Sequence, residues 1–230
     1  RLGKHFGREI ERLKDQLFTL CTDVEEAVHN AARAIKHRDA NLARTVIEQD
    51  DTIDEEEVNV EEECLKILAL HQPVAQDLRL VVAILKINND LERIGDLAVN
   101  IAERAIFLAD QRETPYPMDF ITMAKKARAM LRSSIDALVK EDMKKAQAVL
   151  AADDEVDAMN REMYHIVEDG ILEDPTQVKP LLHMLSASRH IERIADLATN
   201  IAEDVIYMIQ GQIVRHRIED YTANDKKADA

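Results

Sequence analysis

The chain has 230 residues and a formal net charge of −15. This acidity disfavours nucleic acid as a partner, because phosphate backbones are bound by neutralising them with Lys and Arg. Five glycines, five prolines and no tryptophan are typical of a protein built from long helices rather than strands. No segment approaches the ~20 apolar residues of a membrane span, and residues 1–12 lack the apolar stretch of a secretory signal. We therefore expect a cytoplasmic protein without direct membrane insertion.

Apolar residues recur every three or four positions along most of the chain, and proline-containing segments interrupt the pattern. This spacing predicts six long helices. In chain order they cover residues 8–37, 42–70, 76–111, 118–140, 142–168 and 176–210. The sequence therefore predicts an all-α protein made of two tandem, pseudo-symmetric three-helix bundles, residues 1–112 and 113–211. Residues 212–230 are polar, and we expect them to fray.

One stretch of sequence occurs twice. LERIGDLAVNIAE at residues 91–103 returns as IERIADLATNIAE at residues 191–203. Packing alone would preserve only the apolar pattern, yet four polar residues are repeated as well. They are Glu92, Asp96, Asn100 and Glu103, which return as Glu192, Asp196, Asn200 and Glu203. On a helix each set lies within an arc of roughly 80°, opposite the apolar seam. The repetition indicates a duplicated polar site.

A second acidic motif is duplicated on the preceding helix of each bundle. A shift of 103 residues relates Asp50 and Asp54 to Asp153 and Asp157. In an up-down bundle these helices run antiparallel to those carrying the first motif, so the two acidic pairs could face one another. The axial register is not determined by the sequence. The aspartates could equally flank the apolar seam without binding anything.

Carboxylates crowded on one helix face repel each other, by a few tenths of a kcal/mol per pair. Two compensators are possible. Arg93 and Arg193 could hold a solvated acidic face through salt bridges, since such faces are often plain surface. Alternatively, carboxylate and amide oxygens could bind a cation, because this ligand set suits hard metals. In that case the two arginines would orient the ligands.

An enzymatic alternative does not fit the pattern. Di-iron bundles combine core-facing glutamates with ExxH motifs, and the chain contains Glu26–His29 and Glu162–His165. Both motifs lie opposite their apolar seams and on non-equivalent helices, so we expect no catalytic site. Cys21 and Cys64 belong to no metal-binding spacing and are expected to be reduced thiols in the core.

The chain resembles the PhoU family over residues 8–211. The resemblance rests on four acidic pairs, on Glu-Arg-Ile-Gly-Asp at 92–96, and on the segment from Gln72 to Arg79. The pairs are Asp50/Asp54, Glu92/Asp96, Asp153/Asp157 and Glu192/Asp196. Ala195 stands where the family often repeats glycine. Residues 176–179 match the Gln72 segment poorly, which puts in doubt a role shared by both copies of Arg79. With Arg93 and Arg193, Arg79 belongs to the residues expected to orient or support the metal ligands. We expect Arg79 to bridge helices of the first bundle.

The resemblance implies a cytoplasmic negative regulator of phosphate uptake and of the phosphate-starvation response, without catalytic turnover. It also implies partners: the ATPase subunit of a phosphate ABC transporter and a sensor histidine kinase, with the protein itself a homodimer. Relatives bind iron or zinc clusters at the paired acidic motifs, and magnesium, manganese or calcium remain possible here. No phosphate-binding loop is present, so we expect phosphate status to arrive through the partners. The alternatives are a scaffold for another transporter or kinase and a metal-free helical repeat.

Overall fold

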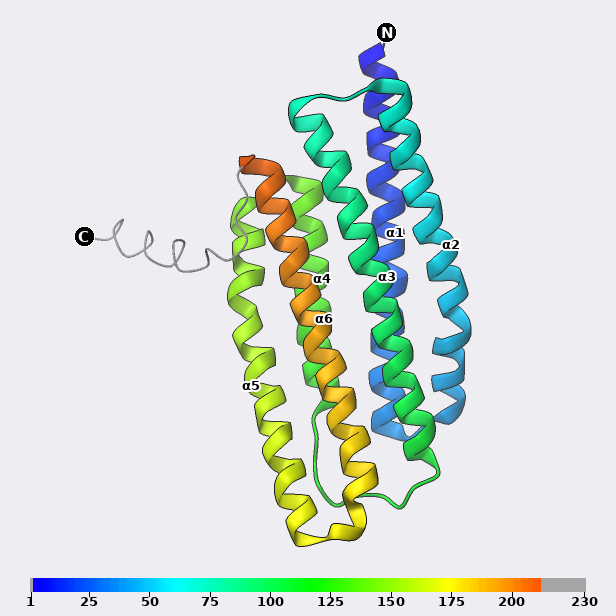
Figure 1. The fold of residues 1–230 in the computed structure, drawn as a ribbon, viewed down its shortest axis with the longest axis vertical. Coiled ribbons are helices and arrows are strands. Elements are labelled where there is room, and N and C mark those ends of the chain that lie inside the picture. The colour runs from blue at the N-terminus through cyan, green and yellow to red at the C-terminus, as the bar shows by residue number, and fades with distance from the viewer. Residues whose placement is uncertain (1, 212–230) are drawn as a thin grey trace, which may run out of the picture.

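The computed structural model describes residues 2–211, and the predicted tail, residues 212–230, lies outside them. The described residues form six long helices, which confirms the predicted all-α class (Figure 1). They are α1 (Leu2–His37), α2 (Ala40–His71), α3 (Ala75–Ala109), α4 (Phe120–Lys140), α5 (Met143–Glu173) and α6 (Val178–Gln210). α5 extends five residues beyond its predicted end, and a 3-10 turn at Pro175–Gln177 precedes α6.

The corner between the first two helices of each repeat is built in the same way. Asp39 caps α2, its carboxylate accepting from the backbone N–H of Asn41 (3.0 Å) and Leu42 (2.9 Å). Asp142 caps α5 and accepts from the N–H of Lys145 at 3.0 Å. Such caps satisfy backbone donors that have no partner within the helix. The shift of 103 residues therefore holds for structure as well as for sequence.

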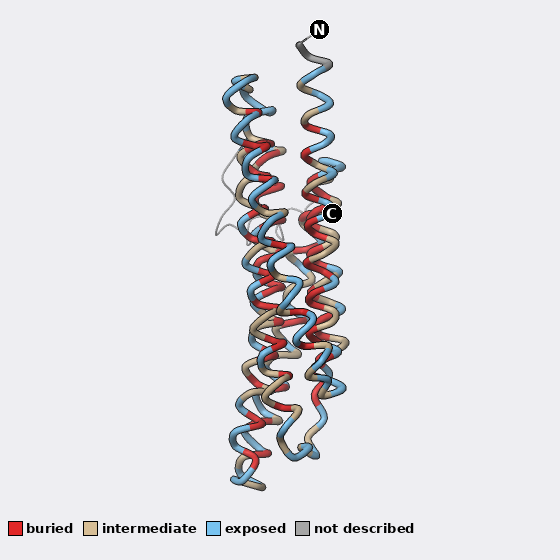
Figure 2. The backbone as a smooth tube through the Cα atoms, turned by 90° about the vertical axis from the view of Figure 1, so that its right-hand side faces the viewer, coloured by how far each residue is buried: buried red, intermediate tan, exposed pale blue. Residues whose placement is uncertain are grey.

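The two three-helix bundles share one core. α1, α2 and α3 form the first bundle and α4, α5 and α6 the second, with α1 packed on α4 and α3 on α6. Buried residues follow the inward faces along the whole length of the molecule (Figure 2). Across the α1–α4 contact, Arg132 Nε lies 2.7 Å from Oε1 of the buried Glu25. Cys21 and Cys64 are fully buried and unpaired by disulfides, as predicted.

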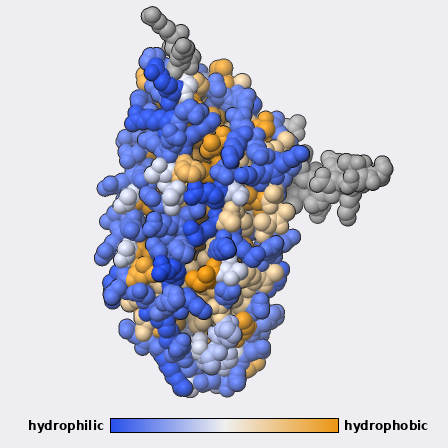
Figure 3. All heavy atoms as spheres, turned by 180° about the vertical axis from the view of Figure 1, so that it is seen from behind, coloured by the Kyte–Doolittle hydropathy of each residue, from blue (hydrophilic) through white to orange (hydrophobic). Residues whose placement is uncertain are grey.

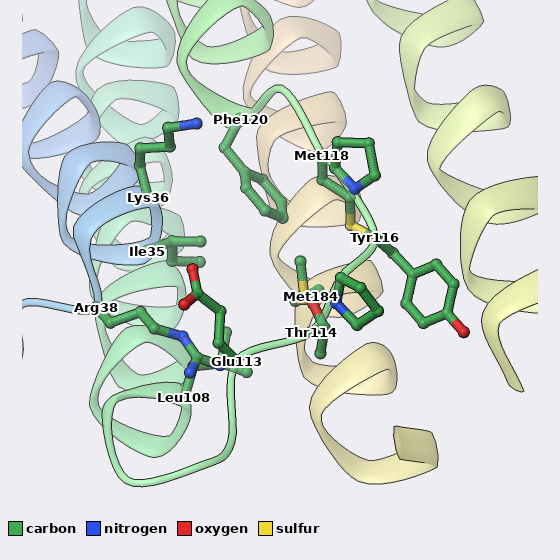
Figure 4. Close-up of a pocket in the computed structure, with 12 residues that line it drawn as sticks. Ile35, Lys36, Arg38, Leu108, Glu113, Thr114, Tyr116, Met118, Phe120 and Met184 are labelled. Atoms are coloured by element: carbon green, nitrogen blue, oxygen red, sulfur yellow. Dashed lines mark hydrogen bonds between the residues drawn. The ribbon is translucent and has the colours of Figure 1, made fainter. Parts of the chain in front are cut away.

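The connection between the bundles, residues 110–119, is tied to the end of α1. The Arg38 guanidinium donates to the carbonyl oxygens of Gln111 (2.8 Å) and Arg112 (3.3 Å). A cavity of about 250 Å³ lies at this joint, and Thr114 and Met184 are among the residues around it (Figure 4). None of the acidic pairs lines it. Among the described residues, no helix is both long enough and apolar enough to cross a membrane.

Candidate metal sites

A buried polar contact fixes the register between α2 and α3. The Asn88 side-chain amide donates to the backbone carbonyl of Glu57 (2.9 Å) and to its Oε1 (2.8 Å). Two turns further on, Asp50 meets α3 at Gly95: a Cβ added to this glycine would lie 3.3 Å from Asp50 Oδ1. Because the helices are antiparallel, this register brings the acidic pair of α2 against that of α3. The structure thus supplies the alignment that the sequence left open.

The first acidic face consists of Asp50, Asp54, Glu92 and Asp96, whose like charges lie close together. Partial burial, followed by the charges of Asp54 and Asp96, raises the pKa of Asp50 to about 6. Burial also raises the pKa of Glu92, and Asp96 and Asp54 raise it further. The charges of Asp54 and Asp96 therefore disfavour ionisation of Asp50 and Glu92, the expected effect of like charges brought close together. A proton or a bound cation would relieve this repulsion.

The second repeat reproduces the arrangement. The Ser188 hydroxyl donates to Asn160 Oδ1 at 2.8 Å, at the positions equivalent to Asn88 and Glu57. Burial, then Asp157 and Asp196, raises the pKa of Asp153 to about 6. Asp153 Oδ1 is also buried without a hydrogen-bond partner in the described part of the chain. Neither helix periodicity nor the repeat shifts could have revealed these two polar contacts, because a shift relates equivalent positions and not the residues that meet across two helices.

Three of the remaining duplicated polar residues, Glu103, Asn200 and Glu203, have surroundings of their own. Asn200 and Glu203 line a different cleft, between α6 and α3. There the Lys86 ammonium lies 3.1 Å from Asp204 Oδ1. Glu103 is exposed and lies 3.6 Å from the guanidinium of its neighbour Arg104. The expectation placed all four residues of each stripe in one site, and it stays a prediction for Asn100. Angular position alone does not settle it, because Glu103 lies about 10 Å further along the helix axis than Asp96.

The three arginines have different surroundings. Arg93 Nη1 lies 3.3 Å from Asp90 Oδ1 on its own helix and lines the same α3–α6 cleft. Arg193 lowers the pKa of Asp196 and Glu192, against the larger effect of burial, so it lies near the second acidic face. Arg79 Nε donates to the Met208 carbonyl of α6 at 3.1 Å. Arg79 therefore bridges the two repeats, which corrects the expectation of a link within the first bundle.

Within the described residues, no three His, Cys, Asp or Glu side chains converge closely enough to hold a metal ion. The oxygen atoms of the acidic pairs are nevertheless suitable ligands for a metal ion. Two rigid helices present opposed oxygen ligands, the pKa values of Asp50 and Asp153 are raised, and one buried oxygen, Asp153 Oδ1, lacks a hydrogen-bond partner in the described part of the chain. Oxygen donors of this kind suit hard and borderline divalent cations. Binding would require the side chains to turn toward one another.

The residues of the di-iron alternative lie where the sequence predicted. Glu26, Glu162 and His165 are exposed, and His29 is only partly buried. None of them points into a bundle core. Catalysis at these motifs has no structural support.

Comparisons with known proteins point to one family. The family described as PhoU domain matches residues 17–105 and 120–205. The phosphate-specific transport system accessory protein PhoU homolog of Aquifex aeolicus is 39% identical over 210 residues, covering 91% of this chain and 95% of that protein. PhoU of Escherichia coli is 33% identical over 219 residues, covering 94% and 91%.

Solved structures agree with these relatives. The crystal structure of PhoU from Pseudomonas aeruginosa superposes with a TM-score of 0.84 at 37% identity and covers 90% of this chain and all of that one (100%). The regulatory protein PhoU from Streptococcus pneumoniae gives a TM-score of 0.82 at 27% identity, with coverage of 91% and 99%. The similarity extends over both repeats.

Proposed function

Given that the chain belongs to the PhoU family of phosphate-transport accessory proteins, we propose that it acts in the cytoplasm as a negative regulator of phosphate uptake and of the phosphate-starvation response. Proteins of this family are accessory and regulatory, not enzymes. In this role the chain is an adaptor between the ATPase subunit of a phosphate transporter and a sensor histidine kinase. A net charge of −15 favours basic surfaces on those partners.

The observation that carries the proposal is the duplication of opposed acidic pairs, in which burial and neighbouring charges raise the pKa of Asp50 in the first repeat and of Asp153 in the second. Selection for packing alone would not keep carboxylates that repel each other. We assign one metal site to each repeat, with iron or zinc as the first candidates and magnesium, manganese or calcium as alternatives. The ligands are Asp50, Asp54, Glu92 and Asp96 in the first repeat, and Asp153, Asp157, Glu192 and Asp196 in the second.

A bound cation at these sites would neutralise charge and link two helices. Other residues of the chain position the carboxylates. The Asn88–Glu57 and Ser188–Asn160 contacts hold each helix pair in register, so that the carboxylates stay opposed. Arg193 lies beside the second site and favours the ionised form of Asp196. The sites therefore serve regulation through the shape and charge of an exposed face, and we expect the adaptor to act as a homodimer.

The test is the double substitution Asp96→Ala and Asp196→Ala. Protein purified without chelator is analysed for bound metal, and the same variant is scored for phosphate-responsive gene repression in cells. We expect stoichiometric metal in the native protein, and loss of both metal and repression in the variant. Retained metal would refute the site assignment, whereas lost metal with intact repression would make the metal structural.

A matched control comes from the same motif. Glu103→Ala with Glu203→Ala removes two duplicated carboxylates that lie outside the acidic pairs, and this variant should keep its metal.

Pull-down with the transporter ATPase and the kinase sensor region tests the partners. Capture of neither would favour a scaffold for another transporter or kinase. A native protein that contains no metal and takes none up would favour the metal-free helical repeat.

A further inference from the structure

The groove between the first two helices of each repeat differs sharply between the repeats. In the first repeat it encloses about 160 Å³, and Asp23, Glu26, Gln49 and Thr52 line it. In the second repeat the equivalent groove, between α4 and α5, encloses about 550 Å³. The shift of 103 residues places Lys126 at the position of Asp23, Ala129 at Glu26, Ala152 at Gln49 and Glu155 at Thr52. Two of the side chains that fill the first groove, Glu26 and Gln49, are thus replaced by alanines in the second, while Lys126 and Glu155 stand at its rims.

The floor and the rims of the α4–α5 groove have different chemistry. Met130 and Val149 form a buried apolar floor, and Ala129 and Ala148 are exposed at its sides. Small residues at these places allow the backbone of a docking segment to come close. Viewed from behind, apolar surface interrupts the hydrophilic surface on the half of the molecule that carries the second repeat (Figure 3).

The side chains that line the groove carry three positive charges, Lys126, Lys144 and Lys145, against two negative charges, Asp142 and Glu155. Lys126 pairs with Glu155 across the groove, and Lys145 lies 3.2 Å from Asp136. The Asp142 carboxylate is engaged as the cap of α5. Lys144 is exposed, and the described part of the chain supplies it with no ion-pair partner. An apolar groove with a free cation on its rim, in a chain of net charge −15, selects for an acidic and partly apolar occupant.

We propose that the α4–α5 groove binds an amphipathic α-helix of a partner protein, with acidic residues flanking its apolar face. From Lys144 to Glu155 the groove follows about three turns of α5, or roughly 17 Å. That length accommodates the apolar anchors at i, i+3/i+4 and i+7 through which helices dock in grooves. The proposal needs neither metal nor the acidic faces, so it can fail or hold independently of the metal sites.

Two other occupants are less well matched. The described chain ends at Gly211 on the α6 side of α5, where Gln210 Nε2 contacts Met143 Sδ at 2.9 Å. Residues 212–230 carry four basic and four acidic side chains, so this segment lacks the net negative charge that the groove favours. A second copy related by a two-fold axis would bring this groove, with its excess of positive charge, against the same groove. A separate partner meets neither obstacle.

The experiment uses the full chain and a fluorescently labelled helical peptide of 18 residues, with leucines on one face and glutamates beside them. A comparison peptide carries lysines in place of the glutamates. Fluorescence anisotropy should show binding of the acidic peptide, with the lysine peptide at least tenfold weaker. Failure of the acidic peptide to bind at millimolar concentration, or equal binding of both peptides, would overturn the proposal.

Variants locate the peptide. Ala129→Glu combined with Ala152→Gln introduces the side chains that the first repeat carries at the equivalent positions. Folding should therefore be preserved, and a thermal melt verifies this. We expect at least a tenfold loss of affinity. Lys144→Glu should weaken binding several-fold, while Lys125→Glu, on the same face of the molecule but outside the groove lining, should not. Unchanged affinity in the groove variants would place the peptide elsewhere and overturn the assignment.

Two further outcomes would assign the groove to a different occupant. Peptide binding that appears only after removal of residues 212–230 would give the groove to this chain's own segment. Concentration-dependent self-association that Ala129→Glu with Ala152→Gln abolishes would give it to a second copy. Either result would overturn the proposed partner helix.

Discussion

The two repeats agree at one helix contact and differ at another. Where α2 meets α3 and α5 meets α6, both repeats keep opposed carboxylates, and in each the pKa of one aspartate, Asp50 or Asp153, rises to about 6. Where α1 meets α2 and α4 meets α5, an acidic, filled groove in one repeat corresponds to an open, alanine-lined groove in the other. A costly feature that both copies retain points to a shared function. A feature that only one copy has points to a specialised one.

The largest expected effect tests whether the two repeats are energetically separate. Leu91 and Ile191 occupy equivalent, fully buried positions. Leu91→Ala and Ile191→Ala should each reduce the free energy of unfolding by about 2–5 kcal/mol, since a buried side chain is lost and a cavity remains. Because both repeats share one core, each substitution should shift a single transition, followed by circular dichroism during urea unfolding. Two transitions, each sensitive to only one substitution, would show independent repeats.

The next effect concerns pH and the metal-free acidic faces. Asp50 and Asp153 have pKa values near 6 in the folded protein, above the ordinary value of 3.8. Between about pH 4 and 6 the unfolded chain gives up these protons first, so the folded state binds more protons and its stability falls as pH rises. We expect a loss of about 1 kcal/mol per site, moderated by solvent screening.

Asparagine substitutions provide the check. Asp50→Asn and Asp153→Asn should each flatten this part of the stability–pH curve, measured by urea unfolding in chelator between pH 4 and 7. Equal flattening would support equivalent acidic faces. Flattening of the stability–pH curve in only one variant would show that the two acidic faces are not equivalent. A curve unchanged in both variants would contradict the raised pKa values.

Periodicity and duplication predicted the six helices because long amphipathic segments determine both their own structure and the face that they bury. Asp39 as a cap was predictable for the same local reason. The axial register was not, because it depends on the buried contact of Asn88 with Glu57, and no helix pattern reveals its partner across the bundle. The position of Asn200 and Glu203 at the α3–α6 cleft was not predictable either, because a helical stripe gives a direction but not which neighbouring helix lies opposite. Arg79 was misplaced because its acceptor belongs to the other repeat.

The smallest effect concerns the one position where the acidic motifs differ, Gly95 against Ala195. Alanine at position 95 should gain about 1 kcal/mol of helix propensity. Its Cβ would, however, lie 3.2 Å from Ile53 Cγ2 and 3.3 Å from Asp50 Oδ1, contacts tight enough to offset most of that gain. Gly95→Ala should therefore change the free energy of unfolding by only a few tenths of a kcal/mol.

The same substitution should affect the acidic face more than the fold. The new methyl group pushes against the carboxylate of Asp50, so metal affinity in the first repeat should fall several-fold while the second repeat is unaffected. Titration of metal into the variant with Asp196→Ala, which leaves only the first site, measures this directly, with the Asp196→Ala protein alone as control. Equal affinity with and without the methyl group would mean that the glycine serves helix packing at Ile53 rather than the position of Asp50.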